Sequence, residues 1–94
     1  MLAPVGANLS ATDLYSLSVH IQEAWLENNR ASMIGERDKA ADFLHDALNM
    51  TENLVDSYPR LSTEVQNLPS SHQETIYNEM SIAHMLLKQY KRRV

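Results

Sequence analysis

Histidine and carboxylate side chains are the groups in this chain that could bind a metal or transfer protons, and the chain has four histidines and twelve acidic residues. The closest two histidines, His72 and His84, are 12 positions apart, so none has the short spacing that places two ligands on one helix face. His20 lies near Glu23 and Glu27, but a carboxylate-bridged site needs matching Glu-x-x-His pairs from two helices. We therefore predict no metal site and no cofactor.

The sequence also lacks the motifs that are typical of nucleophilic catalysis. The chain has no cysteine, no glycine-rich phosphate loop and no Gly-x-Ser-x-Gly motif, and its serines cluster where helices are expected to begin. The helix predicted at 36–58 presents its carboxylates to solvent, whereas an enzyme needs a concave site that shifts pKa values. We expect no catalytic residues and a protein that is not an enzyme.

The segment 36–58 separates apolar from polar side chains most clearly. With a 3.6-residue period, its apolar side chains share one face and its charged side chains share the other. No stretch of the chain alternates with a period of two, so we predict no strand. The expected fold is all-α, a small antiparallel bundle of three long helices and one short helix that forms a dimer. The helices are expected at about 11–31, 36–58, 60–68 and 71–93, in a single domain 10–94 that follows a flexible arm, residues 1–9.

Local signals set these boundaries. Ser10, with an acid three residues later, resembles a capping box that opens the first helix. Gly35 lies where the first apolar pattern stops and the second begins. Pro59 disfavours the helical conformation of the residue before it, so we expect the second helix to end at Tyr58. Apolar residues spaced four and three apart then predict the short helix 60–68.

Two groups of apolar residues lie off the main apolar faces. The first helix has a second stripe, roughly 100 to 140 degrees from its main stripe by the 100-degree step of a helix, and two residues of the last helix lie outside its heptad-like seam. One small domain cannot easily bury both groups, so we predict that they contact a second copy or a partner helix. The alternatives are that the first helix runs through the centre of a monomer, or that a few apolar side chains are simply exposed. The predicted interface residues are Tyr15, Val19, Leu26, Met33, Ile82 and Met85.

The net charge of -4 is unevenly distributed. All twelve acidic residues precede Lys88, while four of the eight basic residues lie from Lys88 onward. An acidic body argues against a broad nucleic-acid interface, because phosphate binding needs several cations on one face. We call Asp42, Asp46, Glu52 and Asp56 the acidic ridge, which is either a solvated face or a docking surface for a basic partner segment. We call Lys88, Lys91, Arg92 and Arg93 the basic tail, which either complements the helix dipole or contacts phosphate or anionic lipid.

The sequence has no recognisable targeting segment. No basic residue precedes Arg30, and residues 1–12 resemble neither a secretory signal nor a transit peptide. Charged residues interrupt every stretch long enough to cross a bilayer. We therefore expect a cytoplasmic protein that does not bind membranes.

The segment from Gly35 to Leu48 resembles the second helix of a tetratricopeptide repeat, with glycine at the turn and small residues at Ala40 and Ala47. The same stretch is similar to small, acidic flagellin-export chaperones. A repeat array needs about three units, and no second copy of the pattern is present. A generic helical hairpin accounts for the same residues, and we favour it.

These observations predict a non-enzymatic protein–protein interaction module. We expect a small acidic adaptor, chaperone or regulator that binds an amphipathic helix of a partner protein and forms a homodimer. Two alternatives stay open. One is a dimeric nucleic-acid-binding regulator that uses the basic tail, and the other is a helical bundle that binds a metal or cofactor.

Overall fold

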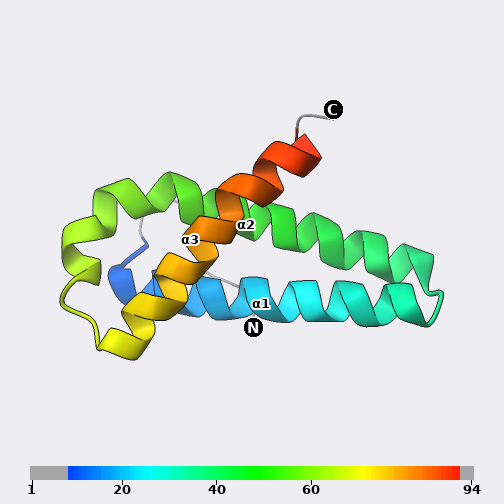
Figure 1. Ribbon diagram of the computed structural model, residues 1–94, viewed down its shortest axis with the longest axis horizontal. Helices are drawn as coiled ribbons and strands as arrows, with labels where there is room; N and C mark the ends of the chain where they lie inside the picture. Colours follow the sequence, from blue (N-terminus) through cyan, green and yellow to red (C-terminus); the bar gives the residue numbers. More distant parts are fainter. Residues whose placement is uncertain (1–8, 92–94) are drawn as a thin grey trace.

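Three α-helices and the turns between them make up the described part of the chain. The computed structural model describes residues 9–91, and over that range it contains α1 (Ala11–Met33), α2 (Arg37–Val65) and α3 (Ser70–Lys91) and no strand. α1 and α2 run antiparallel beside each other, and α3 crosses this hairpin obliquely on one side (Figure 1). The predicted all-α architecture is confirmed. Between residues 9 and 91, no helix has an apolar stretch long enough to cross a membrane.

A capping box begins α1, as the sequence predicts. The backbone N–H of Asp13 donates to Ser10 Oγ at 3.3 Å, and the backbone N–H of Ser10 donates to Asp13 Oδ2 at 2.9 Å. Two backbone donors that the first helical turn cannot pair internally are thus satisfied. This cap fixes where α1 starts.

The turn between α1 and α2 is built on Gly35. Its φ of +80° lies in the left-handed region, which glycine adopts without the penalty that a Cβ brings. The N–H of Gly35 donates to the carbonyl of Ser32 at 3.2 Å, and the N–H of Glu36 donates to the carbonyl of Ala31 at 2.9 Å. This pair of bonds is a Schellman motif, which ends α1 and reverses the chain into α2.

Small residues let α1 and α2 approach closely along the half of the hairpin next to this turn. Ala24 and Ala31 on α1 and Ala40 and Ala47 on α2 are all buried, and the seven-residue spacing within each pair keeps it on one helix face. The side-chain Nδ2 of Asn28 donates to the carbonyl oxygen of Ala40 at 2.7 Å, which joins the two helices directly. The contact therefore depends on backbone proximity rather than on large interlocking side chains.

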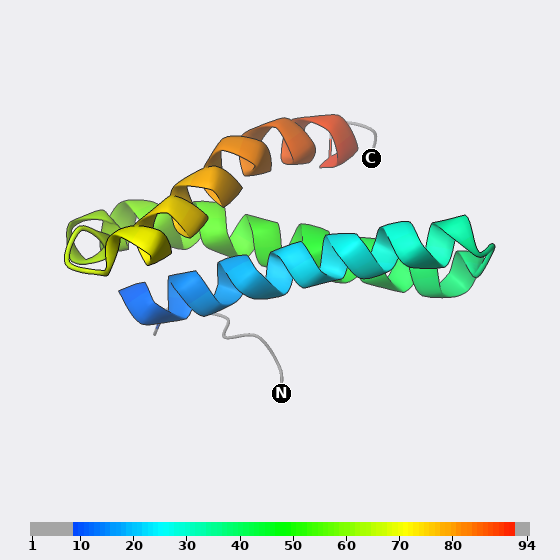
Figure 2. The same ribbon diagram turned by 60° about the horizontal axis from the view of Figure 1, so that its bottom comes forward.

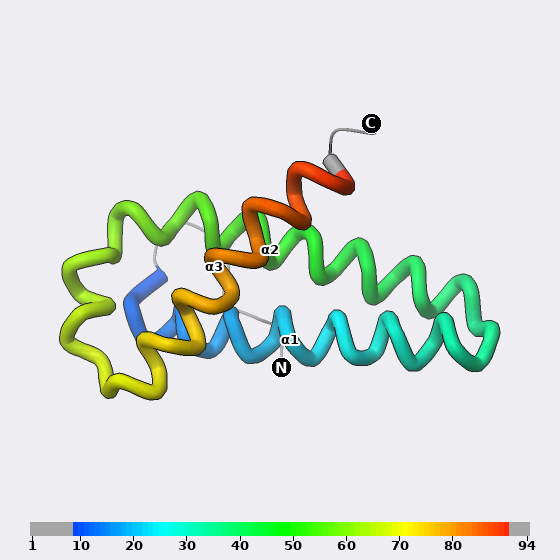
Figure 3. The backbone as a smooth tube through the Cα atoms, in the orientation of Figure 1, coloured from blue at the N-terminus to red at the C-terminus, as the bar shows by residue number. Residues whose placement is uncertain are grey.

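The short helix predicted at 60–68 is not a separate element, because Pro59 does not end α2. The prediction that the second helix stops at Tyr58 is wrong, since α2 continues to Val65. Leu61 and Val65 extend the apolar face of α2 and are buried in the core, and this packing outweighs the hydrogen bond that proline removes. α2 curves over the start of α1 in its last turns, as expected where a proline ring must clear the carbonyl one turn earlier (Figure 3).

A short turn links α2 to α3. The backbone N–H of Gln73 donates to the carbonyl of Pro69, and its side-chain Nε2 donates to the carbonyls of Gln66 and Leu68 at 3.1 and 2.8 Å. One side chain thereby pairs two carbonyls of the turn between the helices. From this turn α3 rises across the hairpin, as Figure 2 shows.

The hydrophobic core lies in the half of the hairpin that α3 covers. The large buried side chains come from 14–21 of α1, from 54–65 of α2 and from α3, where Ile76 is fully buried. In the other half, from 24 to 47, the buried hydrophobic residues are alanines. The core is therefore one-sided along the length of the molecule. Its members are Leu9, Ala11, Leu14, Leu17, Ile21, Leu54, Leu61, Val65 and Ile76.

The flexible arm predicted at residues 1–9 falls mainly outside the described residues. Leu9 is described, and it is buried in the core cluster. Residues 1–8 lie outside the part of the chain that the structure describes.

Candidate functional site

Large apolar side chains are exposed at the end of the hairpin beyond α3. Leu26 is 63% exposed, Met33 86% and Ile34 65%, and we call these three residues the distal patch. They lie on the half of the hairpin in which the buried hydrophobic residues are alanines. Large apolar side chains exposed near one another on a small protein can mark a contact with another molecule. The distal patch is therefore the strongest candidate for a binding surface.

The predicted second stripe of α1 divides at the end of α3. Tyr15 is half-buried and stacks on His72 of α3, with ring centroids 3.9 Å apart, and Val19 is half-buried. Further along α1, Trp25 contacts Tyr90 near the end of α3, at 5.9 Å between ring centroids. Beyond this contact the stripe continues as exposed Leu26 and Met33. α3 therefore covers the first part of the stripe within the chain and leaves its second part bare.

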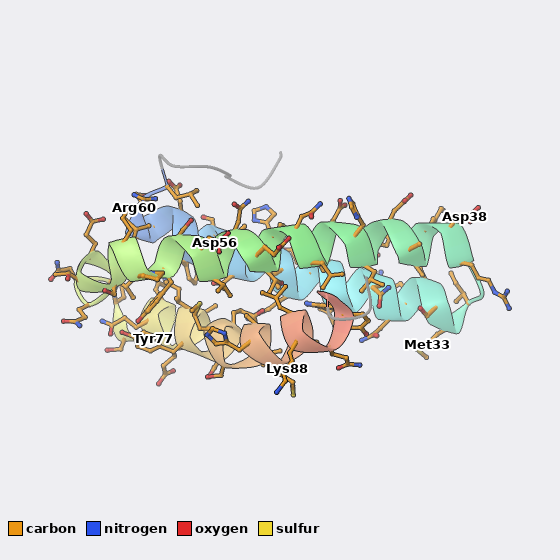
Figure 4. The ribbon with its side chains drawn as sticks, turned by 90° about the horizontal axis from the view of Figure 1, so that it is seen from above. Met33, Asp38, Asp56, Arg60, Tyr77 and Lys88 are labelled. Atoms are coloured by element: carbon orange, nitrogen blue, oxygen red, sulfur yellow. The ribbon has the colours of Figure 1, made fainter. Side chains whose placement is uncertain are left out.

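A second exposed apolar surface lies on α3. Ile82 is 41% exposed and Met85 is 61% exposed, and we call them the α3 patch. Lys88, three residues after Met85, is also exposed. Figure 4 shows Lys88 and Met33 on the same side of the molecule, the side on which α3 lies. The distal patch and the α3 patch are therefore offset along the length of the hairpin.

The predicted acidic ridge runs along α2. Asp42, Asp46 and Asp56 are exposed, and Glu52 is half-buried with an interaction of its own. Asp38 and Asp56 lie along the side of α2 that faces the viewer in Figure 4. The ridge thus places three exposed carboxylates along α2.

The predicted basic tail is described only in part. Lys88 is exposed on α3, and the backbone of Lys91 ends that helix. Arg92 and Arg93 lie outside the described residues. Cations at the last turn of a helix are stabilised by its dipole, whatever else they contact.

A buried carboxyl group lies between α1 and α3, and the sequence analysis does not identify it. Glu79 is buried, and Gln22 Nε2 donates to its Oε2 at 3.3 Å. Burial raises the pKa of this carboxyl above its ordinary value, and the hydrogen bond from Gln22 opposes the rise in pKa. The signal in the sequence is the position of Glu79, three residues after buried Ile76 and four before buried Ala83, which places it on the seam of α3.

The histidines do not gather in one place. His20 Nδ1 lies 2.7 Å from the carbonyl oxygen of Ser16, His72 stacks on Tyr15, and His45 and His84 are exposed. Within residues 9–91, no three His, Asp or Glu side chains form a group that could hold a metal ion.

Comparison with known proteins finds no match: no family model fits the chain, and no curated protein or solved structure is similar to it. The resemblance of the segment Gly35 to Leu48 to a tetratricopeptide repeat gains no support from these comparisons.

The exposed surfaces can bind by two physical effects. Apolar contact favours covering the distal patch and the α3 patch, because each large side chain removed from water contributes about 1.5 to 3 kcal/mol. Charge favours a basic partner along the acidic ridge, mainly by steering and orienting it.

Proposed function

We propose that this protein is a non-enzymatic protein–protein interaction module that docks an amphipathic helix on the distal half of its α1–α2 hairpin. The observation that carries the proposal is the exposure of Leu26, Met33 and Ile34 over a half-hairpin whose buried hydrophobic residues are alanines. Such a module serves as a small acidic adaptor, chaperone or regulator.

The arrangement of α3 supports a helix as the docked element. α3 already lies across the same side of the hairpin, where Tyr15 and Trp25 of α1 contact it. A docked helix would continue this layer past Tyr90 and cover Leu26 and Met33. Helices with apolar residues at three- and four-residue spacing bind such surfaces in many complexes.

The charge of α2 supports a basic partner. Asp42 and Asp46 lie on the acidic ridge beside the distal half of the hairpin and are exposed. A helix with apolar residues on one face and lysines on its flanks would place cations along this ridge. The ridge then sets the orientation of the helix, while apolar contact supplies most of the affinity.

A designed peptide tests this proposal. The probe is a fluorescent helical peptide with leucines at heptad spacing and lysines on both flanks, and its match carries glutamates in place of the lysines. Covering three apolar side chains contributes about 4.5 to 9 kcal/mol, and an association cost of about 4 kcal/mol or more leaves a dissociation constant on the order of 0.2 mM or weaker for the lysine peptide. We expect the glutamate peptide to bind more weakly, as measured by fluorescence anisotropy.

Variants assign the binding to the proposed surface. Leu26→Glu is expected to weaken binding of the lysine peptide about tenfold or more, because it places a charge in the apolar contact. Thr12→Glu adds the same charge at an exposed position in the first turn of α1, at the opposite end of that helix from Met33, and is expected to leave binding intact. Reversing the charge of Asp42 and Asp46 to lysine is expected to reduce the preference for the lysine peptide. Equal affinity of wild type and Leu26→Glu would remove the distal patch as the docking surface.

A further inference from the structure

The two exposed apolar patches are complementary in position. α3 lies over the core half of the hairpin, where His72 in its first turn contacts Tyr15, and it ends near Trp25 of α1. The distal patch begins at Leu26, where this cover ends, and the α3 patch lies on the covering helix itself. One side of the molecule therefore has a raised half that carries an apolar patch and a lower half that carries another.

We propose that the helix docked on the distal patch is α3 of a second copy of this chain, so that two molecules clasp each other reciprocally. The inference rests on the docking surface proposed above and names its partner. A half-turn about an axis that is vertical in Figure 1 brings the two α3-bearing sides face to face. The raised half of each copy then lies over the lower half of the other.

In this arrangement the α3 patch of each copy contacts the distal patch of the other. Ile82 and Met85 of one copy pack on Leu26 and Met33 of its partner. Because the contact is isologous, each pairing occurs twice across the axis. Two surfaces that one chain leaves exposed are thereby covered by a single symmetric interface, and each α3 becomes enclosed between two hairpins.

Charge complementarity favours a second copy over an unrelated helix. The C-terminal end of α3 is basic, with Lys88 exposed beside the α3 patch and Lys91, Arg92 and Arg93 following it in the sequence. The remaining body, residues 1–87, contains all twelve acidic residues and the other four of the eight basic ones. In the clasp the basic end of each α3 approaches the acidic α2 of the partner, so opposite charges meet twice. The C-terminal end of α3 thus supplies the cations that the acidic ridge would orient.

Solution mass tests the clasp. Light scattering and sedimentation on the wild-type chain are expected to give twice the chain mass of 10.7 kDa. Leu26→Glu and Ile82→Lys are each expected to give a monomer, because every copy carries the change and both symmetric contacts are damaged; a weakening of about a hundredfold or more is expected. Both residues are exposed and both replacements favour helix, so circular dichroism is expected to stay that of the wild type. Thr12→Glu, at an exposed position in the first turn of α1, is the charge-matched control and is expected to remain dimeric.

Mixing the two variants tests reciprocity. A copy with Leu26→Glu and a copy with Ile82→Lys form one wild-type contact and one Glu–Lys contact, so the equimolar mixture is expected to recover the dimer that neither variant forms alone. Recovery supports the clasp. A wild-type monomer overturns it, as does a dimer that survives both substitutions or a mixture that stays monomeric.

The lysine peptide separates this inference from the proposed function. If the clasp forms, Ile82→Lys leaves the distal patch open and binds the peptide, while the wild-type dimer binds it only as the copies dissociate. If the wild-type chain is a monomer and binds the peptide through Leu26, the clasp is wrong and the docking function stands. If the monomer shows no binding that depends on Leu26, both proposals fail.

Discussion

Glu79 of α3 accepts a hydrogen bond from Gln22 of α1 across the interface between the two helices, with 3.3 Å between Gln22 Nε2 and Glu79 Oε2. The glutamate is 7% exposed, and within residues 9–91 no ion pair to it is found. The same interface contains the stacked pair Tyr15 and His72. α3 is thus held on α1 by a hydrogen bond to a buried carboxyl group and by aromatic contacts as well as by apolar packing.

Stability is therefore expected to depend on the protonation of Glu79. Its pKa is raised above the ordinary value of 4.5, mainly by burial, so the folded chain binds this proton more readily than the unfolded chain does. The stabilising contribution is fully present below pH 4.5 and is lost as the pH rises through the folded pKa. Glu79→Gln is neutral and can still hydrogen-bond Gln22, so it is expected to raise the free energy of unfolding at pH 7 and to leave it nearly unchanged at pH 3.5.

The matched control for this experiment is Glu74→Gln, an exposed position on the same helix. Urea unfolding at the two pH values measures both variants. If Glu79→Gln raised the free energy of unfolding by the same amount at pH 7 and at pH 3.5, the buried charge would not be its cause. The same conclusion would follow if Glu74→Gln raised the free energy of unfolding at pH 7 as much as Glu79→Gln does.

The turn at Gly35 is expected to resist any residue with a Cβ for reasons of backbone conformation alone. Its φ is +80°, and a Cβ built there has no atom within 4 Å, so no steric clash with neighbours is involved. Gly35→Ala is expected to lower the free energy of unfolding by about 1 kcal/mol, the net of left-handed strain and reduced freedom of the unfolded chain. Gly35→Asn is expected to lose less, because asparagine tolerates this conformation better. Thermal unfolding ranks the three proteins, and an alanine variant as stable as wild type would refute this account.

Elements set by local chemistry could be predicted from the sequence, and elements set by distant packing could not. The start of α1 at Ser10 and the turn at Gly35 depend on hydrogen bonds and dihedral angles of adjacent residues, which the sequence displays directly. Pro59 was misleading because the burial of Leu61 and Val65 is decided by residues far along the chain. Local rules describe the cost of a proline in a helix, but not the packing that offsets it.

The candidate site follows the same division. Periodicity identified two stripes on α1, but only the path of α3 decides that Tyr15 is covered and Met33 is bare. That path depends on the stacking of Tyr15 on His72 and on the pairing of Gln22 with Glu79, contacts between residues about 57 positions apart. No local pattern encodes such pairs. Ile34 was missed because it lies past the predicted end of the first helix, beside the turn.

The hydrogen bond between Asn28 and Ala40 is expected to contribute measurably to the distal half of the hairpin. Asn28 Nδ2 donates to the Ala40 carbonyl at 2.7 Å in a partly buried contact, in the half of the hairpin where the buried hydrophobic residues are alanines. Asn28→Ala removes this bond and is expected to cost about 1 kcal/mol in the free energy of unfolding. Asn29→Ala, at the exposed neighbouring position, is the control and is expected to change stability by less than about 0.5 kcal/mol. Hydrogen exchange of the α2 amides near Ala40 is expected to quicken in Asn28→Ala alone, and uniform exchange rates in both variants would argue against this contact.

Trp25 carries a donor that finds no acceptor among the residues that the structure describes. Its Nε1 is buried against α3, where the ring lies 5.9 Å from that of Tyr90. A desolvated donor without a partner costs about 1 to 3 kcal/mol, so Trp25→Phe, which removes it while keeping an aromatic ring, is expected to change the free energy of unfolding by less than about 1 kcal/mol. Trp25→Ala also removes the ring and is expected to cost about 3 kcal/mol or more. Chemical denaturation followed by circular dichroism compares the two variants, because the chain's single tryptophan is lost in both. If Trp25→Phe lowered the free energy of unfolding as much as Trp25→Ala, the indole N–H would have to donate a stabilising hydrogen bond. That result would contradict an unpaired donor at Trp25.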